Sequence, residues 1–291
     1  MHVLNAAHDS LVNDLPTTKR DIYYQDVKLF GSQRGLTDDL AATLGLDRAD
    51  LNIRASSKGL LCGSGLVIHL KEGGTVAATN SDPILIPHAE DIYHFEVQGN
   101  LKWVLVAVFQ TLCRLHITDH PSFPAAGVMI TGKGYPDIAT RQLVATLSRN
   151  LPATVPILAF VDGDAFGLDI VSVYKFGSRS LQHEAYKLTA SRIECIGLWA
   201  SELTGYDIEP DAMLPVTAAD EKKARAMLQR PLKALPERWR DELHGMLAGR
   251  RKAEIEALVS RANVRQASQQ THPLVRYLAD KITALVGAAE I

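Results

Sequence analysis

The stretch Val155-Pro-Ile-Leu-Ala-Phe-Val-Asp-Gly-Asp164 decides the fold. Its first seven residues form an apolar run, which is typical of a strand buried on both faces of a parallel sheet. Helical periodicity follows over residues 166–176. Open α/β sheets place functional groups at the carboxyl ends of their strands. We therefore expect a functional site at Asp162 and Asp164.

The same alternation of strand and helix continues on both sides of this stretch. Strands are predicted over residues 103–106, 127–130 and 193–199, and helices over 107–115 and 137–149. After Pro215 the apolar spacing predicts four helices, over residues 218–228, 237–247, 252–262 and 273–286. The predicted fold class is α/β, with a parallel sheet covered on both faces and C-terminal helices.

The N-terminal part has a different pattern. Apolar positions recur at helical spacing over residues 3–12, 19–30 and 36–46, and two strand-like segments follow, 51–54 and 65–70. Three helices followed by a β-wing are typical of a winged helix-turn-helix. The residues after Gly73 are loop-like. We therefore expect a winged-helix domain over 1–75, a linker over 76–100 and a sheet domain over 101–291.

The composition excludes several classes of protein. With 46% hydrophobic and 22% charged residues, the chain can bury a sizeable core, which excludes wholesale disorder. Its apolar runs are far shorter than the ~18–20 residues of a membrane span, so we expect no membrane partner. Cys62, Cys113 and Cys195 are widely spaced, which predicts neither a disulfide framework nor a zinc site and indicates a reducing compartment.

The formal net charge of −2 conceals an uneven distribution of charge. Residues 59–100 carry one basic and five acidic side chains, whereas residues 220–265 carry twelve basic and seven acidic ones. A basic helical region is usually a solvated surface, and it can also contact phosphates.

Asp162 and Asp164 are the first candidate site. Two carboxylates two residues apart on a glycine turn can both reach a hard cation such as Mg²⁺. Acidic residues also end strands and cap helices without any ligand. From the residues alone, both interpretations stay open.

Arg20 and Tyr24 are the second candidate site, because residues four apart share one face of a helix. A tyrosine of ordinary pKa is only about one part in a thousand phenolate at neutral pH. An adjacent guanidinium would favour the anion and bind a phosphate oxygen. A tyrosine that attacks a phosphodiester could use that pairing. The alternative is that Tyr23 and Tyr24 are a packing pair at a helix surface.

The loop Gly132-Lys-Gly-Tyr-Pro136 is the third candidate site. It lies between a predicted strand and a predicted helix, so its backbone N–H groups and Lys133 could hold an anion. It lacks the spacing of a Walker A loop. A structural turn is the alternative.

These features occur together in an order that resembles the topoisomerase VI A-subunit family, including its eukaryotic branch that makes meiotic double-strand breaks. The matching stretches are Lys19–Tyr24, Leu29–Gln33, Ser57–Leu60, Gly132–Arg141, Val161–Asp169, Tyr174–Ser178, Lys252–Glu256 and His272–Val275. The resemblance covers nearly the whole chain. Fungal members look most similar.

The resemblance implies a winged-helix domain with the nucleophile and a Toprim domain with the metal. By motif position, Tyr24 would attack a DNA phosphate and Arg20 would stabilise it, while Asp162 and Asp164 would hold Mg²⁺. The family also implies a nuclear homodimer on double-stranded DNA, whose partners are other meiotic break-forming proteins and a topoisomerase VI B-like subunit. Further DNA phosphate contacts are expected at Lys58, Lys133 and Arg141.

One departure from the family bears on activity. Family members carry a glutamate just after the first Toprim strand, and about four residues that would include it are absent after Val106. No turn residue separates the strand predicted over 103–106 from the helix predicted over 107–115, although about 2–6 are usual. An incorrectly assembled coding sequence is the favoured explanation, and a decayed paralogue is the other. The chain is therefore either a Mg²⁺-dependent DNA transesterase or a catalytically impaired DNA-binding scaffold.

Overall fold

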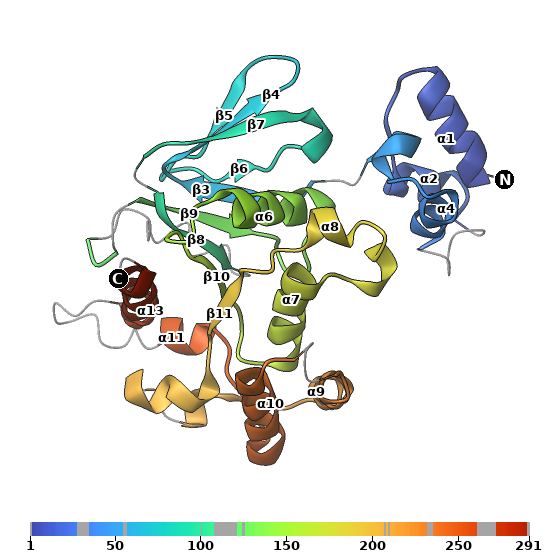
Figure 1. The fold of residues 1–291 in the computed structure, drawn as a ribbon. Helices are drawn as coiled ribbons and strands as arrows, with labels where there is room; N and C mark the ends of the chain where they lie inside the picture. Colours follow the sequence, from blue (N-terminus) through green and yellow to red (C-terminus); the bar gives the residue numbers. More distant parts are fainter. Residues whose placement is uncertain are drawn as a thin grey trace.

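The computed structural model describes residues 2–27, 35–54, 57–99, 101–107, 121–123, 126–206, 208, 210–231, 235–260 and 272–289. Figure 1 shows a central sheet with helices around it, a smaller sheet next to it, and a group of N-terminal helices set to one side.

The central sheet has six strands in the order β11-β10-β8-β9-β3-β6. The strands β8 to β11 pair in parallel, whereas β3 and β6 join antiparallel at one edge. Their bounds are β3 (Leu60–Gly63), β6 (Ile84–Leu85), β8 (Leu101–Ala107), β9 (Ala126–Thr131), β10 (Ile157–Phe160) and β11 (Glu194–Gly197). The four strands predicted over residues 103–106, 127–130, 155–161 and 193–199 are confirmed as β8, β9, β10 and β11.

The prediction of a wholly parallel sheet is corrected, because the sheet is mixed. A parallel neighbour needs a crossover connection, usually an α-helix. The described chain between β3 and β8 contains strands and one 3₁₀ turn but no α-helix. Strand β3 therefore runs opposite to β9, and β6 runs opposite to β3.

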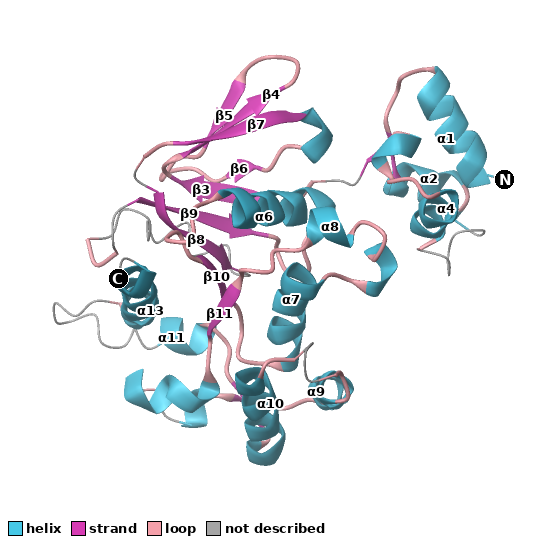
Figure 2. Ribbon diagram, viewed as in Figure 1, coloured by secondary structure: helices cyan, strands magenta, loops and turns pink. Residues whose placement is uncertain are grey.

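Helices cover both faces of the central sheet, as predicted. Val104 of β8 belongs to the hydrophobic core beneath α6 (Ile138–Asn150) and α7 (Ala165–Phe176), whereas its neighbour Trp103 belongs to a second core against α13 (Pro273–Ala289). Successive side chains of a strand point to opposite faces. Figure 2 shows α6 and α7 on one side of these strands and α13 on the other. The predicted helix over 107–115 lies outside the described residues, apart from Ala107 in β8.

Gly127 fixes how closely β9 approaches Trp103. A Cβ atom at this position would lie 2.1 Å from the Trp103 ring, which is fully buried. Since a buried ring cannot yield, we expect Gly127→Ala to destabilise the protein by about 3 kcal/mol. Gly245→Ala is the matched control, because nothing lies within 4 Å of that position in its helix. Denaturant unfolding of both variants measures the difference, and equal stabilities would contradict this account.

A second sheet has the order β5-β4-β7, with bounds β4 (Leu66–Leu70), β5 (Thr75–Ala77) and β7 (Ile92–Val97). It corrects one expectation, because the predicted linker over 76–100 contains strands that pack on the main core instead of a loop-like connection. The domain boundaries at 75 and 100 stay a prediction.

The winged helix-turn-helix is not confirmed. The two segments expected to form the wing lie in different sheets: β2 (Ile53–Arg54) pairs with β1 (Thr17–Thr18), whereas β4 pairs with β5 and β7. The physical reason is the burial of Ile68, which is 0% exposed and joins the core of the central sheet.

The predicted N-terminal helices are confirmed as α1 (His2–Val12), α2 (Lys19–Gln25) and α4 (Leu36–Leu44). Thr18 and Asp21 form a capping box at the start of α2. Gly45 ends α4 in the left-handed conformation, with φ 67°. Residues 28–30 of the second predicted helix lie outside the described part.

The C-terminal part contains α9 (Ala218–Leu228) and α10 (Glu237–Gly249), as predicted. The helix predicted over 252–262 is wrong at its start: β13 (Arg251–Lys252) pairs with β12 (Leu214–Pro215), and α11 (Glu256–Ser260) begins four residues later than predicted. Residues 261 and 262 lie outside the described part. Tertiary bonding overrides the helical periodicity here, because the backbone of Ala253 bridges to Gly163. Within the described residues, no helix is both long and apolar enough to cross a bilayer.

Candidate functional site

The carboxyl end of β10 holds Asp162 and Asp164 in a fixed loop. The N–H of Gly163 donates to the Ala253 carbonyl at 2.7 Å, and the Ala253 N–H donates back at 3.3 Å. A Cβ atom at Gly163 would lie 2.6 Å from the Leu198 carbonyl oxygen. The Asp-Gly-Asp pattern therefore needs glycine at its centre, because the neighbouring backbone approaches too closely for any side chain.

Asp162 lies in an environment that disfavours its charge. Burial is the main reason that its pKa is raised to about 6, and the nearby carboxylates of Asp164, Glu256 and Glu254 act in the same direction. One oxygen accepts a hydrogen bond from the Ile255 N–H at 3.0 Å, which only partly offsets this effect. The loop has an excess of negative charge that a cation would relieve.

Asp164 has two contacts that fix its carboxylate. One oxygen accepts the Gly167 N–H at 2.8 Å and caps α7, and the other lies 3.4 Å from the Lys252 ammonium. Lys252 also lies 3.4 Å from Asp220 and 3.3 Å from Glu254. This lysine ties the start of α7 to the start of α9, next to the carboxylate pair.

The donor set fits Mg²⁺. Asp162 and Asp164 supply hard oxygen ligands, and protein sites for Mg²⁺ often use only one or two carboxylates and several waters. In the described ranges no group of three or more His, Cys, Asp or Glu side chains could hold a metal. A magnesium ion here would therefore rely on this pair, on waters and on a bound phosphate.

Arg20 and Tyr24 share one face of α2, as predicted. The Arg20 guanidinium carbon lies 5.6 Å from the centre of the Tyr24 ring, and the Tyr23 ring meets Tyr24 edge-on at 5.5 Å. Ile22, 2% exposed, anchors the helix, whereas Tyr24 is 60% exposed. The phenol oxygen is therefore open to a large substrate, with a cation beside it. The roles of both residues stay predictions.

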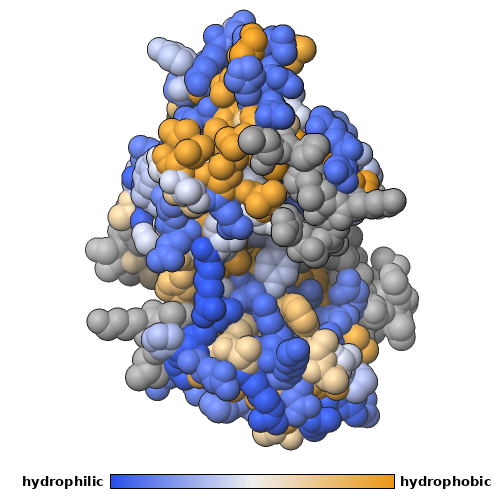
Figure 3. Space-filling view, turned by 90° about the vertical axis from the view of Figure 1, so that its right-hand side faces the viewer, coloured by the Kyte–Doolittle hydropathy of each residue, from blue (hydrophilic) through white to orange (hydrophobic). Residues whose placement is uncertain are grey.

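The tyrosine and the carboxylate pair lie in separate parts of the chain. Figure 1 shows α2 beside α1 and α4, and the start of α7 at the far end of the central sheet, near α9 and α10. No hydrogen bond, ion pair or ring contact joins α2 to Asp162 or Asp164 in the described residues. Seen from the side of the N-terminal helices, an apolar patch lies in the upper half of the surface, with hydrophilic side chains above and below it (Figure 3).

Lys58 and Lys133 are exposed neighbours on one edge of the sheet domain. The Lys58 ammonium lies 3.4 Å from the Lys133 carbonyl oxygen. The backbone N–H groups of Lys58 and Gly59 donate to one oxygen of Asp137 at 2.7 and 3.1 Å, and its other oxygen caps α6. Asp137 thus joins the stretch Ser57–Leu60 to the stretch Gly132–Arg141, both of which match the family. Both lysines can face a phosphate. Phosphate contact by them stays a prediction.

Arg141 does not lie on the surface that its expected role requires. Its side chain is 2% exposed, and its Nη1 atom donates to Ser178 at 3.3 Å. Burial lowers its pKa to about 10. Helical periodicity places residue 141 on the inward face of α6, so the expected DNA contact is corrected to an internal contact between α6 and the loop after α7.

Asp169 is a polar hub that the sequence reasoning missed. It accepts a hydrogen bond from the Tyr135 hydroxyl at 2.7 Å and pairs with Lys223 and Arg230, each at 2.5 Å. Burial opposes its ionisation, but hydrogen bonds from Lys223, Tyr135 and Arg230 outweigh burial and lower its pKa. The hub holds the Lys133 loop against α7 and α9.

Asp169→Asn is expected to lower the melting temperature by roughly 5 °C at pH 7, because charged hydrogen bonds are lost. The folded pKa of Asp169 lies below its ordinary value of 3.8. Its stabilisation is therefore present above about pH 4 and is lost as the pH falls through the folded pKa. Melting curves from pH 7 to pH 3 should converge for the two proteins, and exposed Asp82→Asn should match the wild type throughout. A constant difference at all pH values would contradict the assignment.

Lys252 is the second functional residue that the sequence did not predict, although its position in a stretch that matches the family could have indicated it. It begins the matching stretch Lys252–Glu256, but the helix expected there concealed the extended backbone that packs this stretch against the Asp162 loop. Asp169 likewise ends the matching stretch Val161–Asp169. Its partners are distant in sequence, so no local pattern indicated them.

Two family descriptions match this chain. Residues 105–282 match the Toprim domain of the topoisomerase 6 A-subunit/Spo11 proteins, and residues 1–53 match "Type IIB DNA topoisomerase". The first match alone covers more than half of the chain and includes the Asp162 loop, Asp169 and Lys252.

Similar proteins cover most of this chain. It is 33% identical over 264 residues to the meiotic recombination protein SPO11 of Mus musculus, covering 89% of this chain and 65% of that protein. It is 33% identical over 264 residues to the meiotic recombination protein rec12 of Schizosaccharomyces pombe, covering 88% and 72%. The A-type subunit of DNA topoisomerase 6 from Arabidopsis thaliana is 31% identical over 270 residues, covering 89% and 60%.

The chain spans 65% of the length of the mouse relative and 60% of the length of the Arabidopsis relative. Similarity alone therefore does not show that this chain has the activity of those whole proteins. The matched regions nevertheless hold Tyr24, within residues 1–53, and the carboxylate pair, within residues 105–282. By sequence, by the Toprim sheet with its Asp-Gly-Asp loop and by these matches, the chain belongs to the topoisomerase VI A-subunit/Spo11 family of type IIB DNA topoisomerases.

Proposed function

We propose that this protein is a topoisomerase-like DNA transesterase that makes double-strand breaks to initiate meiotic recombination. The observation that carries the proposal is the exposed Tyr24 beside the Arg20 guanidinium, in a chain whose Toprim domain presents a carboxylate pair. Two relatives are named meiotic recombination proteins. These names support the biological role.

Tyr24 would act as the nucleophile. Its phenol oxygen attacks a phosphorus atom of the DNA backbone, a new phosphorus–oxygen bond forms, and the bond to the 3′ oxygen breaks. The phenol loses its proton, the leaving 3′ oxygen gains one, and the protein remains joined to the 5′ phosphate. Arg20 would favour the phenolate and bind a phosphate oxygen. The reaction consumes no nucleotide.

Asp162 and Asp164 would hold a magnesium ion. Toprim domains generally bind Mg²⁺, and the ion supplies charge neutralisation at the phosphate and at the leaving oxygen. The chain contributes the rest: the Ile255 N–H orients Asp162, the α7 cap orients Asp164, and Lys252 lies 3.4 Å from Asp164 as a further positive charge.

The separation of α2 from the carboxylate pair supports a two-fold dimer. One active protomer cuts one strand, so a double-strand break needs two copies. In a homodimer, Tyr24 of one protomer would act beside Asp162 and Asp164 of its partner. The exposed lysines Lys58 and Lys133 would contact the duplex, and DNA affinity should fall as salt rises.

Nuclear action and further partners follow from the same proposal. Meiotic recombination takes place on chromosomal DNA, so we propose a nuclear location. The Arabidopsis relative is named as the A-type component of DNA topoisomerase 6, which supports a B-like partner for this chain. Other meiotic break-forming proteins would join this assembly.

Covalent trapping tests the proposed reaction. The purified protein is incubated with supercoiled DNA and Mg²⁺, the reaction is stopped with detergent, and protein-linked DNA is collected on a filter. We expect adducts at 5′ ends only, which 5′-exonuclease resistance and 3′-exonuclease sensitivity would show. Adducts at 3′ ends, or cleavage with free ends only, would contradict the proposal.

A catalytically impaired scaffold is the second candidate function. The observation that favours it is that no group of three or more His, Cys, Asp or Glu side chains in the described residues could hold a metal, together with the missing glutamate segment after Val106. Insertion of four residues that include the family glutamate after Val106 should then create Mg²⁺-dependent cleavage. Cleavage by the unaltered chain would rule out this candidate.

A further inference from the structure

The strand β7 has an open edge. It pairs with β4 alone in the described part of the chain. The Gln98 N–H donates to Gly65 on the β4 side. Because the N–H and C=O of one residue in an antiparallel strand point to the same side, and sides alternate along the chain, those of Phe95 and Val97 point to the open edge. Both residues lie on the regular side of a register shift between the His94 and Ile92 pairings. A row of free backbone groups invites a further strand.

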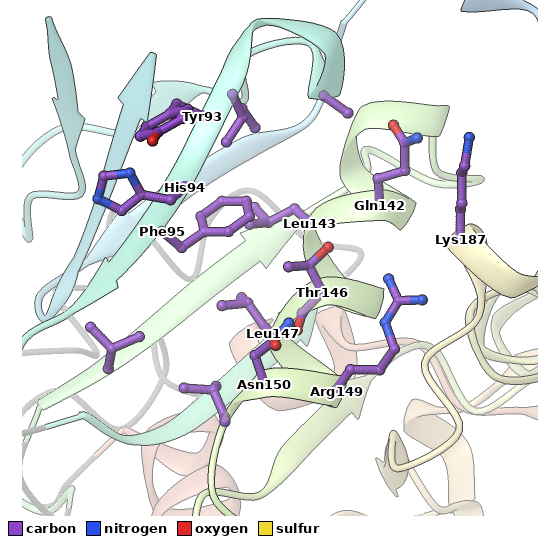
Figure 4. A pocket seen from close by; sticks show the side chains of 14 residues that line it. Tyr93, His94, Phe95, Gln142, Leu143, Thr146, Leu147, Arg149, Asn150 and Lys187 are labelled. Carbon is purple, nitrogen blue, oxygen red and sulfur yellow. Dashed lines mark hydrogen bonds between the residues drawn. The ribbon is translucent and has the colours of Figure 1, made fainter. Parts of the chain in front are cut away.

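A groove of about 680 Å³ lies along this edge, between β7 and α6. Figure 4 shows Phe95 pointing from β7 toward Leu143 of α6, with Leu147 one turn further on. These side chains form an apolar floor. Tyr93 is 73% exposed and Val97 41% exposed at the edge, although natural sheets usually protect their edges with charged residues or proline.

The rim of the groove is positively charged. The groove is lined by the cations Arg149 and Lys187 and by no carboxylate among the described residues. Lys187 pairs with Asp47 of the N-terminal part. Arg149 donates to the Tyr186 carbonyl and has no acidic partner in the described ranges. The excess charge on this rim favours an acidic occupant.

These three features exclude the simpler occupants. Duplex DNA needs many cationic contacts, and this groove offers two cations over an apolar floor. A small molecule would need a deeper enclosure than an open groove beside a strand. An extended peptide matches all three, since its backbone pairs with the edge while alternate side chains face the floor and the rim.

We propose that the β7–α6 groove binds an extended, acidic segment of a partner protein, which adds as a strand to β7. The site accepts about six residues, the length of β7, or about 20 Å of chain. Apolar side chains at alternate positions would meet Phe95, Leu143 and Leu147, and acidic ones would meet Arg149. This binding goes beyond the proposed DNA cleavage and uses none of its residues.

Fluorescence anisotropy tests the proposal with a labelled octapeptide of alternating isoleucine and glutamate. We expect saturable binding by the full chain and at least tenfold weaker binding by Arg149→Glu. Val97→Pro removes a donor from the open edge and leaves the β4 ladder intact, so it should abolish binding. Arg179→Glu, the same charge change at another arginine, should bind like the wild type.

Three controls keep the test decisive. Thr146→Trp would fill the groove from the half-buried outer side of α6, so it should lose binding even if Val97→Pro fails to fold, and thermal melting reports folding of each variant. A peptide with lysine in place of glutamate should bind at least tenfold more weakly. Equal binding of both peptides, no effect of Arg149→Glu, or no saturable binding would overturn the proposal. A dimer that Val97→Pro converts to monomers would instead assign the edge to a second copy of this chain.

Discussion

Covalent attachment to DNA is expected to disappear when Tyr24 is replaced by phenylalanine. The substitution removes only the phenol oxygen, so no phosphorus–oxygen bond can form between protein and DNA. The loss should be on the order of 10⁴-fold or more, as for other nucleophile deletions. Gel-based counting of protein-linked 5′ ends in Mg²⁺ measures it. The fold should be unaffected, because Tyr24 is 60% exposed and makes only surface ring contacts.

Tyr23→Phe is the matched control. The two tyrosines are adjacent, their rings are 5.5 Å apart, and each variant loses one hydroxyl. The Arg20 guanidinium carbon lies 5.6 Å from the ring centre of Tyr24, and this is the contact that distinguishes Tyr24 from Tyr23. Normal adduct formation by Tyr24→Phe, or its loss in Tyr23→Phe alone, would show that the wrong tyrosine has been assigned.

The second large effect is expected at Asp162. Asp162→Asn keeps the shape of the side chain and its acceptor for the Ile255 N–H, but it removes the negative charge that would bind Mg²⁺. We expect cleavage to fall by about 10²–10³-fold, the usual cost of removing one group that stabilises transition-state charge. Calorimetric titration with Mn²⁺ gives a second measurement, since metal affinity should fall in parallel.

Glu254→Gln tests whether the metal binds to the carboxylate pair itself or to the acidic side chains around it. Glu254 lies 3.3 Å from Lys252 and contributes to the raised pKa of Asp162, but it lies outside the Asp-Gly-Asp loop. Its substitution should change Mn²⁺ affinity by only a few-fold. If Glu254→Gln and Asp162→Asn have equal effects, the pair is not the metal site. Thermal melting should show no loss for Asp162→Asn, because burial already disfavours the Asp162 charge.

Local signals predicted the regular elements well. The apolar spacing predicted the bounds of α9, Ala218–Leu228, without error, and Thr217 caps this helix. Strand β10 and its carboxyl-terminal loop followed from one apolar run and two acids. These predictions succeed because capping, turn conformation and side-chain periodicity depend on residues within one or two helical turns of one another.

Predictions that depended on long-range packing were less successful. The segment that begins at Lys252 has helical spacing, yet Lys252 pairs with β12 and the next residue, Ala253, bridges Gly163. The segment 76–100 looked loop-like, and it supplies strands of two sheets. In each place, hydrogen bonds to residues distant in the chain outweigh the local preference.

The sequence by itself determined the α/β class, the Asp-Gly-Asp loop at the end of a central strand and the pairing of Arg20 with Tyr24 on one helix face. Each of these depends on the spacing of nearby residues. Only the tertiary structure decided that Arg141 is buried, that Asp169 pairs with two cations from α9 and the turn after it, and that β7 keeps an open edge over an apolar groove. Burial and charge partners come from segments that meet only when the chain folds, and spacing along the chain does not specify those meetings.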